Sequence, residues 1–305
     1  MPPVVPGPGG ERPLALGAAV GAYVIWGLVP LAFQVLGRMG VSPWEILAHR
    51  TAWAAPTALL FVWMARQGAQ VRAVMGQPRV LAWLAVSAAL LSVNWSVFIW
   101  SVNSGRVLES SLGYYINPLL NMAVGAFLFR ERLSRPALLA IGLATVGVVI
   151  QALALGHLPW VSLVLGFSFC AYGVVRKRVA ADAQTGLFIE CLMLAAPSLA
   201  YMAWLQANGA SSAQGSPVAL LWLVACGPLT ALPLMLFSWA ARRVPFSVMG
   251  FLQFIAPTMT FVLGLAQGEA FTPLRALSFV FIWCGAAVFV FGALRAARSP
   301  VQSAA

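Results

Sequence analysis

Ten stretches of about twenty apolar residues follow one another along the chain, and they restrict its possible folds more than any other feature. A helix needs roughly 20 such residues to cross the hydrocarbon core of a bilayer. Of the 305 residues, 61% are hydrophobic and only 8% are charged, whereas about 25% are charged in a typical soluble domain. The sequence therefore predicts an all-α integral membrane protein with ten transmembrane helices. The stretches lie at residues 14–36, 44–65, 80–103, 108–129, 136–154, 159–175, 186–205, 217–241, 244–267 and 273–294.

The basic residues predict how these helices are oriented. Cytoplasmic loops of membrane proteins are enriched in Lys and Arg. With a cytoplasmic N-terminus, 14 of the 18 Lys and Arg residues fall in cytoplasmic segments, and only Arg38, Arg106 and Arg275 fall on the opposite side. We therefore expect both termini in the cytoplasm, with residues 1–13 as a disordered tail and 296–305 as a second tail. Because the basic residues are spread over loops, the net charge of +11 does not indicate nucleic-acid binding.

Two similar stretches indicate that the chain contains an inverted repeat. "GYYINPLLNMAVGAFLFRERLSRP" begins at Gly113, and "GFLQFIAPTMTFVLGLAQGEAFTP" begins at Gly250. Glycine, proline and glutamate recur, but the arginines beside Glu131 are missing around Glu269. Five helices per half would turn the second copy upside down, so its glutamate would face the outside, where the positive-inside rule asks for no arginines. We expect two five-helix repeats, 14–154 and 155–295, in the arrangement that many secondary transporters use.

Several stretches carry a family resemblance that covers roughly residues 14 to 295. They include "WGLVPLAFQVL" (26–36), "EILAHRTAW" (45–53), "NWSVFIWSVNSGRVLESSLGYYINPLLN" (94–121) and "GFLQFIAPT" (250–258), and together they are more specific than any one of them. With them the chain resembles the drug/metabolite transporter superfamily, in particular the EamA family and its RarD-type permeases. The resemblance implies ten helices, a permease of the bacterial inner membrane and a central cavity. It does not name a substrate.

Polar and aromatic side chains within the apolar stretches are the candidate substrate-binding residues. Such groups are costly in a membrane and often mark a functional site. Arg50 has two readings: an anchor for an anion or carboxylate, or a side chain paired with Glu45 and extended toward the outer headgroups. Aromatic and amide groups suit a flat, partly polar organic molecule better than a small hard ion. The candidates for the cavity are Trp26, His49, Arg50, Asn94, Trp95, Tyr114, Tyr115, Asn117, Tyr172, Trp239 and Gln253.

Few residues could carry a proton or serve as a hinge. Glu190 has no charged partner nearby in the sequence and is the first candidate for proton coupling, followed by His49 and then by Glu45, which we expect Arg50 to keep charged. Pro118 and Pro257 occupy matched positions in the two halves and can interrupt their helices. They are the predicted hinges for rocking one half against the other.

The motifs in the sequence also favour one class of function over the others. A secondary transporter of a small organic metabolite or drug-like molecule is the first hypothesis, and a membrane-embedded lipid-modifying enzyme or a channel is the alternative. The sequence shows no P-loop and no cysteine spacing typical of a metal site, so we expect no enzymatic activity, cofactor or metal. The expected partners are the substrate and membrane lipids. A monomer would suffice, although a homo-oligomer is compatible with the sequence.

Overall fold

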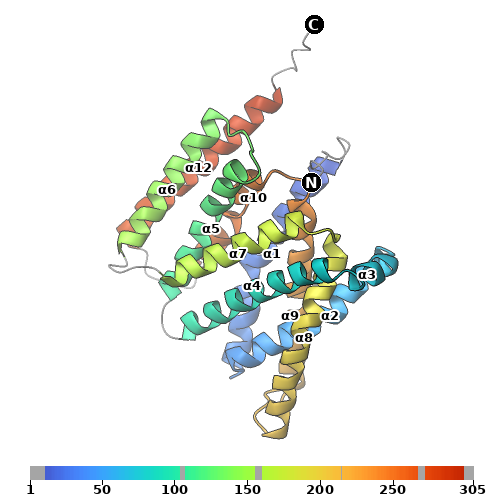
Figure 1. Cartoon of the computed structure of the whole chain (residues 1–305). Coiled ribbons are helices and arrows are strands. Elements are labelled where there is room, and N and C mark those ends of the chain that lie inside the picture. The colour runs from blue at the N-terminus through green and yellow to red at the C-terminus, as the bar shows by residue number, and fades with distance from the viewer. Residues whose placement is uncertain (1–10, 104–106, 155–159, 214, 267–271, 299–305) are drawn as a thin grey trace.

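The computed structural model describes residues 11–103, 107–154, 160–213, 215–266 and 272–298 (Figure 1). Within these ranges the chain is helical and contains no strand. The helices are α1 (Glu11–Arg38), α2 (Pro43–Met64), α3 (Gly68–Met75), α4 (Pro78–Asn103), α5 (Val107–Phe127), α6 (Arg135–Ala154), α7 (Trp160–Arg178), α8 (Ala183–Ala207), α9 (Pro217–Ala241), α10 (Phe246–Leu252), α11 (Ile255–Ala266) and α12 (Pro273–Arg298). The predicted tails at 1–10 and 299–305 lie outside the described residues.

The described helices overlap each of the ten predicted ranges, with two differences from the prediction. The short helix α3 lies in the connection between α2 and α4. The ninth stretch is broken into α10 and α11 around Gln253. Pro257 explains the break, because its ring lacks an N–H and collides with the carbonyl four residues earlier, which is that of Gln253.

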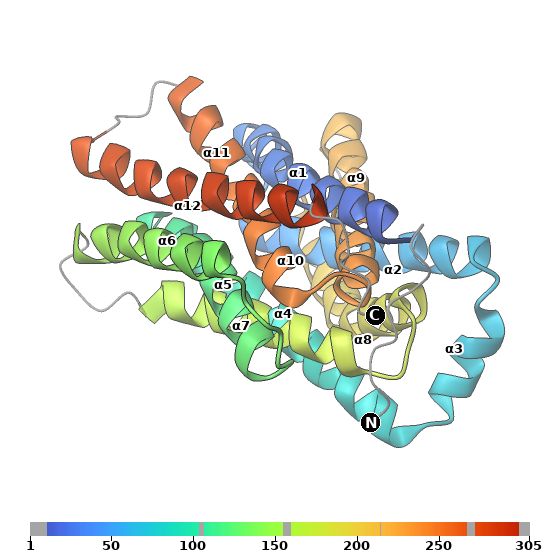
Figure 2. The same ribbon diagram turned by 90° about the horizontal axis from the view of Figure 1, so that it is seen from above.

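Length and hydropathy mark four of the described helical segments as able to cross a membrane: Pro13–Arg38, Pro78–Phe98, Ala183–Ala207 and Pro217–Ala241. Three shorter apolar segments accompany them, at Arg135–Ile150, Phe246–Met259 and Ala276–Gly292. The whole arrangement is a bundle of long helices in which α6 and α12 run side by side at one edge (Figures 1 and 2).

The most extensive helix contacts join the first half of the chain to the second. Helix α2 packs against α8 and α9, and α1 packs against α9 and α11. Helix α5 packs against α7 and α10, α4 packs against α7, and α6 packs against α12. Figure 2 shows the two halves of the colour range mixed throughout the bundle. The halves therefore interlock and do not form two separate bodies.

The two similar stretches of sequence lie against each other at the centre of the bundle. Asn121 on α5 donates a hydrogen bond to the Gln253 side chain at 2.7 Å, and the Tyr115 hydroxyl donates to the Pro257 carbonyl at 3.4 Å. Gly250 makes the close approach of α10 to α5 possible. A Cβ atom at this position would lie 2.7 Å from the Pro118 carbonyl oxygen.

Hydrogen bonds also connect the loops at each end of the bundle. One end of the bundle, which we call the arginine-rich end, is made by residues 66–72, 130–135, 176–182 and 242–245, in loops and at helix ends. There, Asp182 accepts hydrogen bonds from Gln67 and Gln70 and pairs with Arg242 at 3.6 Å. At the opposite end, which we call the far end, the α8–α9 loop contacts the start of α2.

We predict that Gly250→Ala lowers the free energy of unfolding by about 1–3 kcal/mol, because the added methyl group overpacks the contact of α10 with α5. Gly142→Ala on α6 is the matched control, since a Cβ there meets no atom within 4 Å. Replacing a helical glycine in open space should leave stability unchanged or raise it by about 0.5–1 kcal/mol. Unfolding of the purified proteins in detergent measures both effects. Equal stability of the two variants would contradict the close approach at Gly250.

Candidate functional site

Arg50 is the side chain around which the candidate site is built. It lies two turns into α2 and is only 8% exposed. Its Nε donates a hydrogen bond to Thr230 Oγ1 on α9 at 3.2 Å. Its guanidinium carbon lies 4.4 Å from the centre of the Trp95 ring on α4 and 5.3 Å from that of Phe33 on α1. Four helices from both halves of the chain therefore meet around one cation.

The partners of Arg50 compensate its burial only in part. Burying an ion costs several kcal/mol even after the protein relaxes. A desolvated cation–π contact returns about 2 kcal/mol, and a hydrogen bond to a charged group about 1.5–3 kcal/mol. Among the described residues, no carboxylate forms an ion pair with Arg50. A guanidinium has five N–H donors, and only the Nε–H of Arg50 has an acceptor among the described side chains and carbonyls.

Glu45 does not supply the missing negative charge. Its carboxylate accepts hydrogen bonds from the Ser211 hydroxyl and the Ser212 backbone N–H, both at 2.9 Å. Residues five positions apart on a helix point about 140° apart, given 3.6 residues per turn. The reading in which Glu45 and Arg50 pair with each other is therefore wrong: Glu45 fastens the α8–α9 loop to α2, and Arg50 faces the aromatic rings.

Tyr114 extends the aromatic wall beside Arg50. It lies on α5, near Arg50. Its ring meets Phe98 of α4 edge-on, with 5.8 Å between the ring centres. Tyr114 is 39% exposed. The rings of Phe33, Trp95, Phe98 and Tyr114, together with Arg50 and Thr230, form what we call the Arg50 site.

His49 is next to Arg50 in sequence but has a different contact. Its Nδ1 accepts a hydrogen bond from the Trp53 indole N–H at 3.2 Å. An accepting Nδ1 corresponds to the neutral ring with its proton on Nε2. This contact supports a structural role for His49 in the observed arrangement, because a protonated ring could not accept the bond.

Other predicted cavity residues are placed elsewhere. The Asn94 amide donates to the Leu165 carbonyl and to Ser168 Oγ, both at 2.9 Å, and so joins α4 to α7. Trp26 and Tyr172 belong to a packed aromatic cluster around Phe237.

The remaining predicted residues lie at the central crossing or at an end of the bundle. Tyr115 and Gln253 make the contacts of α5 with α10 and α11 described above. Asn117 is buried, and its Oδ1 has no partner among the described residues. Trp239 lies beside the Arg243 guanidinium at the arginine-rich end, 4.3 Å from ring centre to Cζ.

The structure adds Phe33, Phe98 and Thr230 to the site, which sequence reasoning missed. Phe98 follows Trp95 by one helical turn, and that spacing could have indicated it. Phe33 is one of many apolar residues on α1 and carries no distinguishing signal. Thr230 is a hydroxyl between two helix-interior prolines of α9, which marks it only weakly. Within the described ranges, no three His, Cys, Asp or Glu side chains form a set that could hold a metal ion.

A second buried arginine, near the arginine-rich end, has a carboxylate and backbone oxygens as partners, although its Nη1 donates no hydrogen bond to the described residues. Arg176 on α7 is completely buried, and its Nη1 lies 3.6 Å from Oε1 of the equally buried Glu190 on α8. Its other nitrogens donate to the Ala183 carbonyl at 2.9 Å and to Ser238 Oγ at 3.3 Å. Ser87 on α4 donates to the same Glu190 oxygen. The expectation that Glu190 lacks a charged partner is wrong, because the preceding helix brings Arg176 to it.

Glu131 ties the α5–α6 loop to the start of α10. Its carboxylate accepts hydrogen bonds from the Phe246 N–H at 2.6 Å, the Ser247 N–H at 2.9 Å and the Ser247 hydroxyl at 2.7 Å. Lys177, at the end of α7, lies 3.4 Å away. The contact satisfies N–H groups that the start of a helix leaves without partners. It also links three segments at the arginine-rich end.

The pKa of Glu131 reflects these contacts. Partial burial raises the pKa of this carboxyl group, but the hydrogen bonds from Ser247 and Phe246 and the charge of Lys177 outweigh burial and hold the pKa below its ordinary value. The carboxylate therefore stays ionised, and its contacts persist, throughout the neutral range.

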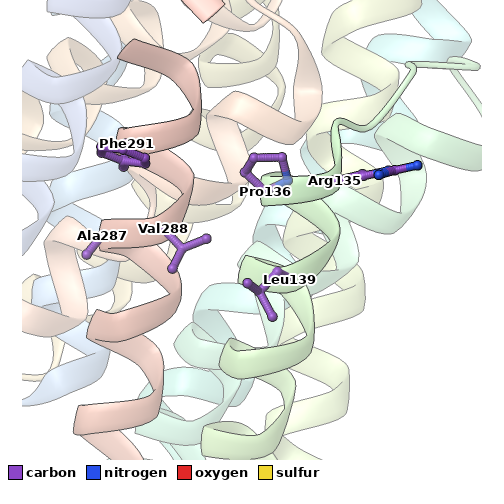
Figure 3. Close-up of a pocket in the computed structure, with 6 residues that line it drawn as sticks. All are labelled: Arg135, Pro136, Leu139, Ala287, Val288 and Phe291. Carbon is purple, nitrogen blue, oxygen red and sulfur yellow. The ribbon is translucent and has the colours of Figure 1, made fainter. Parts of the chain in front are cut away.

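An apolar groove lies between α6 and α12 at the edge of the bundle, apart from the Arg50 site. It is lined by Arg135, Pro136, Leu139, Ala287, Val288 and Phe291. Figure 3 shows the Arg135 side chain pointing away from α12, so the groove itself presents almost only carbon. Such a surface suits lipid chains and not a polar solute.

Comparison with known proteins agrees with this architecture. Residues 13–153 match the EamA-like transporter family. Protein RarD of Streptomyces exfoliatus is 42% identical over 91% of this chain and 88% of its own, and Protein RarD of Escherichia coli K12 is 38% identical over 92% and 95%. An uncharacterized transporter of Vibrio cholerae is 40% identical over 92% and 93%. A crystal structure 21% identical to this chain, covering 94% of it and all of the other, has the same fold with a TM-score of 0.71.

The long apolar helices and these relatives define the class of protein: this is a multi-pass membrane transporter. Within that class, the chain belongs to the EamA-like transporter family of the drug/metabolite transporter superfamily, as a RarD-type protein.

We predict that Glu131→Gln lowers thermal stability at pH 7, and that Ser247→Ala lowers it less, because that variant loses one of the three hydrogen bonds. A carboxyl group with a lowered folded-state pKa stabilises the protein above its unfolded pKa, and the stabilisation is lost as the pH falls through the folded value. The melting temperatures of wild type and Glu131→Gln should therefore begin to converge as the pH falls below the ordinary glutamate pKa of about 4.3, and should meet once it has fallen below the lowered pKa of the folded protein. A difference between them that is the same at pH 7 and pH 3.5 would contradict this account.

Proposed function

We propose that this chain is a secondary transporter that carries a small organic solute across the bacterial inner membrane by alternating access, with the Arg50 site as its binding site. Membership of a transporter family supports the class of function. The observation that carries the mechanism is the pairing of helices, which follows a two-fold pattern.

In that pattern, each extensive contact between two helices corresponds to a contact between the equivalent helices of the opposite halves. Suppose that α1 corresponds to α7, α2 to α8, α4 to α9, α5 to α10–α11 and α6 to α12. The contact of α1 with α9 then matches that of α7 with α4. Likewise, α1 with α11 matches α7 with α5, and α2 with α9 matches α8 with α4. The contacts of α2 with α8, α5 with α10 and α6 with α12 join equivalent helices. This pairing supports two repeats, 14–154 and 155–295, inverted because each holds five helices.

The same contacts change the expected unit of motion. Rocking one repeat against the other would break most of the interhelical packing, because the extensive contacts lie between repeats. Two groups of helices are better connected internally: α1, α9 and α11 form one, and α4, α5 and α7 form the other. The two groups are exchanged by the two-fold relation, so their relative tilt would open the two ends in turn. The break before Pro257 would be the main hinge, since α5 remains one helix through Pro118.

The two groups contact each other in the aromatic cluster around Phe237 and at the arginine-rich end. Arg176 and Tyr172 of α7 contact Ser238 of α9, and Lys177 donates to the Val244 carbonyl at 3.4 Å. By the positive-inside rule this end is cytoplasmic, which places both termini in the cytoplasm. In this mechanism, the observed arrangement corresponds to a state closed toward the cytoplasm, and a solute would reach Arg50 from the periplasm.

This mechanism accounts for the arrangement better than an enzyme or a channel does. An enzyme of lipid modification would gather several acids, histidines or a metal set, and the described residues gather none around Arg50. A channel would not need two halves with interchangeable contacts. One relative is named "Chloramphenicol-sensitive protein RarD", so chloramphenicol is one neutral aromatic compound to include in a substrate screen.

Transport into proteoliposomes tests the proposal. Vesicles preloaded with a bacterial metabolite extract should accumulate at least one labelled external solute faster than empty vesicles do, and uptake should saturate. Stimulation by internal solute indicates a carrier that reorients, whereas a channel gives neither saturation nor stimulation. Chemical conversion of the solute would indicate an enzyme. Vesicles without protein provide the background.

Proton coupling through Glu190 is a further proposal about the same cycle. Tilting α7 away from α9 would break the contacts that hold Arg176 beside Glu190, so the carboxylate could then take up a proton. Uptake by wild type should respond to an imposed pH gradient, and uptake by Glu190→Gln should not. Glu45→Gln is the matched control and should respond like wild type, because the α8–α9 loop holds that carboxylate. No response in wild type, or an equal response in Glu190→Gln, would contradict the assignment.

A further inference from the structure

Two arginines are buried among the residues that the structure describes, and they differ in one respect. Arg176 meets a carboxylate, a hydroxyl and backbone carbonyls. Arg50 meets one hydroxyl and two aromatic rings. A buried guanidinium that is satisfied by the protein serves packing, whereas one that lacks an anion is prepared to receive one.

The acids of the chain that the structure describes with their contacts are occupied elsewhere. Glu45 holds the α8–α9 loop, and Glu131 holds the start of α10. Asp182 pairs with Arg242, and Glu190 pairs with Arg176. Within the described residues, the negative charge opposite Arg50 must therefore come from a molecule that is not part of the chain.

The surroundings of Arg50 limit the shape of that molecule. The rings of Trp95 and Phe33 contact the guanidinium, and Tyr114 and Phe98 continue the wall on α5 and α4. Thr230 occupies Nε, so the outer nitrogens remain for two parallel hydrogen bonds to a carboxylate. One guanidinium balances one negative charge, and aromatic walls favour a planar apolar body.

We propose that the Arg50 site binds a free organic monoanion, a carboxylate attached to a planar or aromatic body. Arg50 binds the carboxylate, and the four rings select the body. This inference rests on the proposed function for its transport consequence, but the binding it describes does not require transport.

Pairs of probes that differ only in charge test the proposal on the full-length protein in detergent. Benzoate is compared with benzamide, and indole-3-acetate with indole-3-acetamide, by the rise in melting temperature and by quenching of tryptophan fluorescence. For wild type we expect each anion to bind at least ten-fold more tightly than its amide, with benzylamine binding no better than the amides. Equal affinities for anion and amide overturn the proposal without any variant.

Substitutions then locate the interaction. Arg50→Gln should remove the preference for the anion, and Arg50→Lys, which keeps the charge but loses the paired donors, should retain a reduced preference. Arg79→Gln, at an exposed position on α4, is the control and should bind like wild type. A preference for anions that persists in a folded Arg50→Gln variant places the site elsewhere and overturns the proposal.

Two further experiments are needed. One distinguishes a free solute from a lipid headgroup as the source of the anion, and the other distinguishes failure of this inference from failure of the proposed function. If nanodiscs of phosphatidylglycerol abolish benzoate binding and nanodiscs of phosphatidylcholine do not, the site binds a lipid headgroup and the free-solute proposal fails. If anions bind through Arg50 but no solute is carried in proteoliposomes, the transporter proposal fails while this inference stands. If a neutral solute such as chloramphenicol is carried saturably and anions do not bind, the transporter proposal stands and this inference fails.

Discussion

A charged group buried among apolar helices must find an opposite charge or a set of hydrogen bonds, because water is not there to provide them. Two arginines in this chain meet that requirement in different ways. Arg176 on α7 is matched inside the protein by Glu190 on α8 and Ser238 on α9, so its contacts link the two groups that would have to move. Arg50 is matched only in part, by rings and one hydroxyl. In the proposed mechanism, the first arrangement holds one end of the bundle closed, and the second is where a solute would bind.

The interlocked packing makes these two arrangements depend on each other. Helix α9 supplies Thr230 to Arg50 and Ser238 to Arg176, and α4 supplies Trp95 to the first site and Ser87 to the ion pair of the second. A tilt of either helix would therefore alter both sites. Gly250 permits the crossing at the centre, where the two repeated stretches meet and where such a tilt would turn.

Much of the fold could be predicted from the sequence, because hydropathy and the distribution of arginines depend only on composition along the chain. The ten ranges and the proline at the break of the ninth stretch follow from such local signals, and so does the position of Arg50 within a helix of the bundle. The partners of Arg50 and Glu190 could not be predicted. Arg50 meets Thr230, 180 positions away, and Glu190 meets Ser87, 103 positions away. Helix packing decides these contacts, and a single sequence does not reveal it.

Asn94 looked like a cavity residue because an amide in a membrane needs a partner, and the structure shows that α7 provides it.

The central claim is that the cytoplasmic end is sealed while the Arg50 site is open to the periplasm, and cysteine labelling tests it most directly. The four native cysteines, of which Cys284 is exposed, would first be replaced by alanine. A single cysteine would then be placed at Phe98, in the Arg50 site, or at Ser238, in the sealed end. With a membrane-impermeant maleimide, the account predicts that Phe98→Cys reacts from the periplasmic side of intact cells and that Ser238→Cys stays unreactive from both sides. Reaction of Ser238→Cys in inverted vesicles, with Phe98→Cys unreactive in cells, would contradict the account.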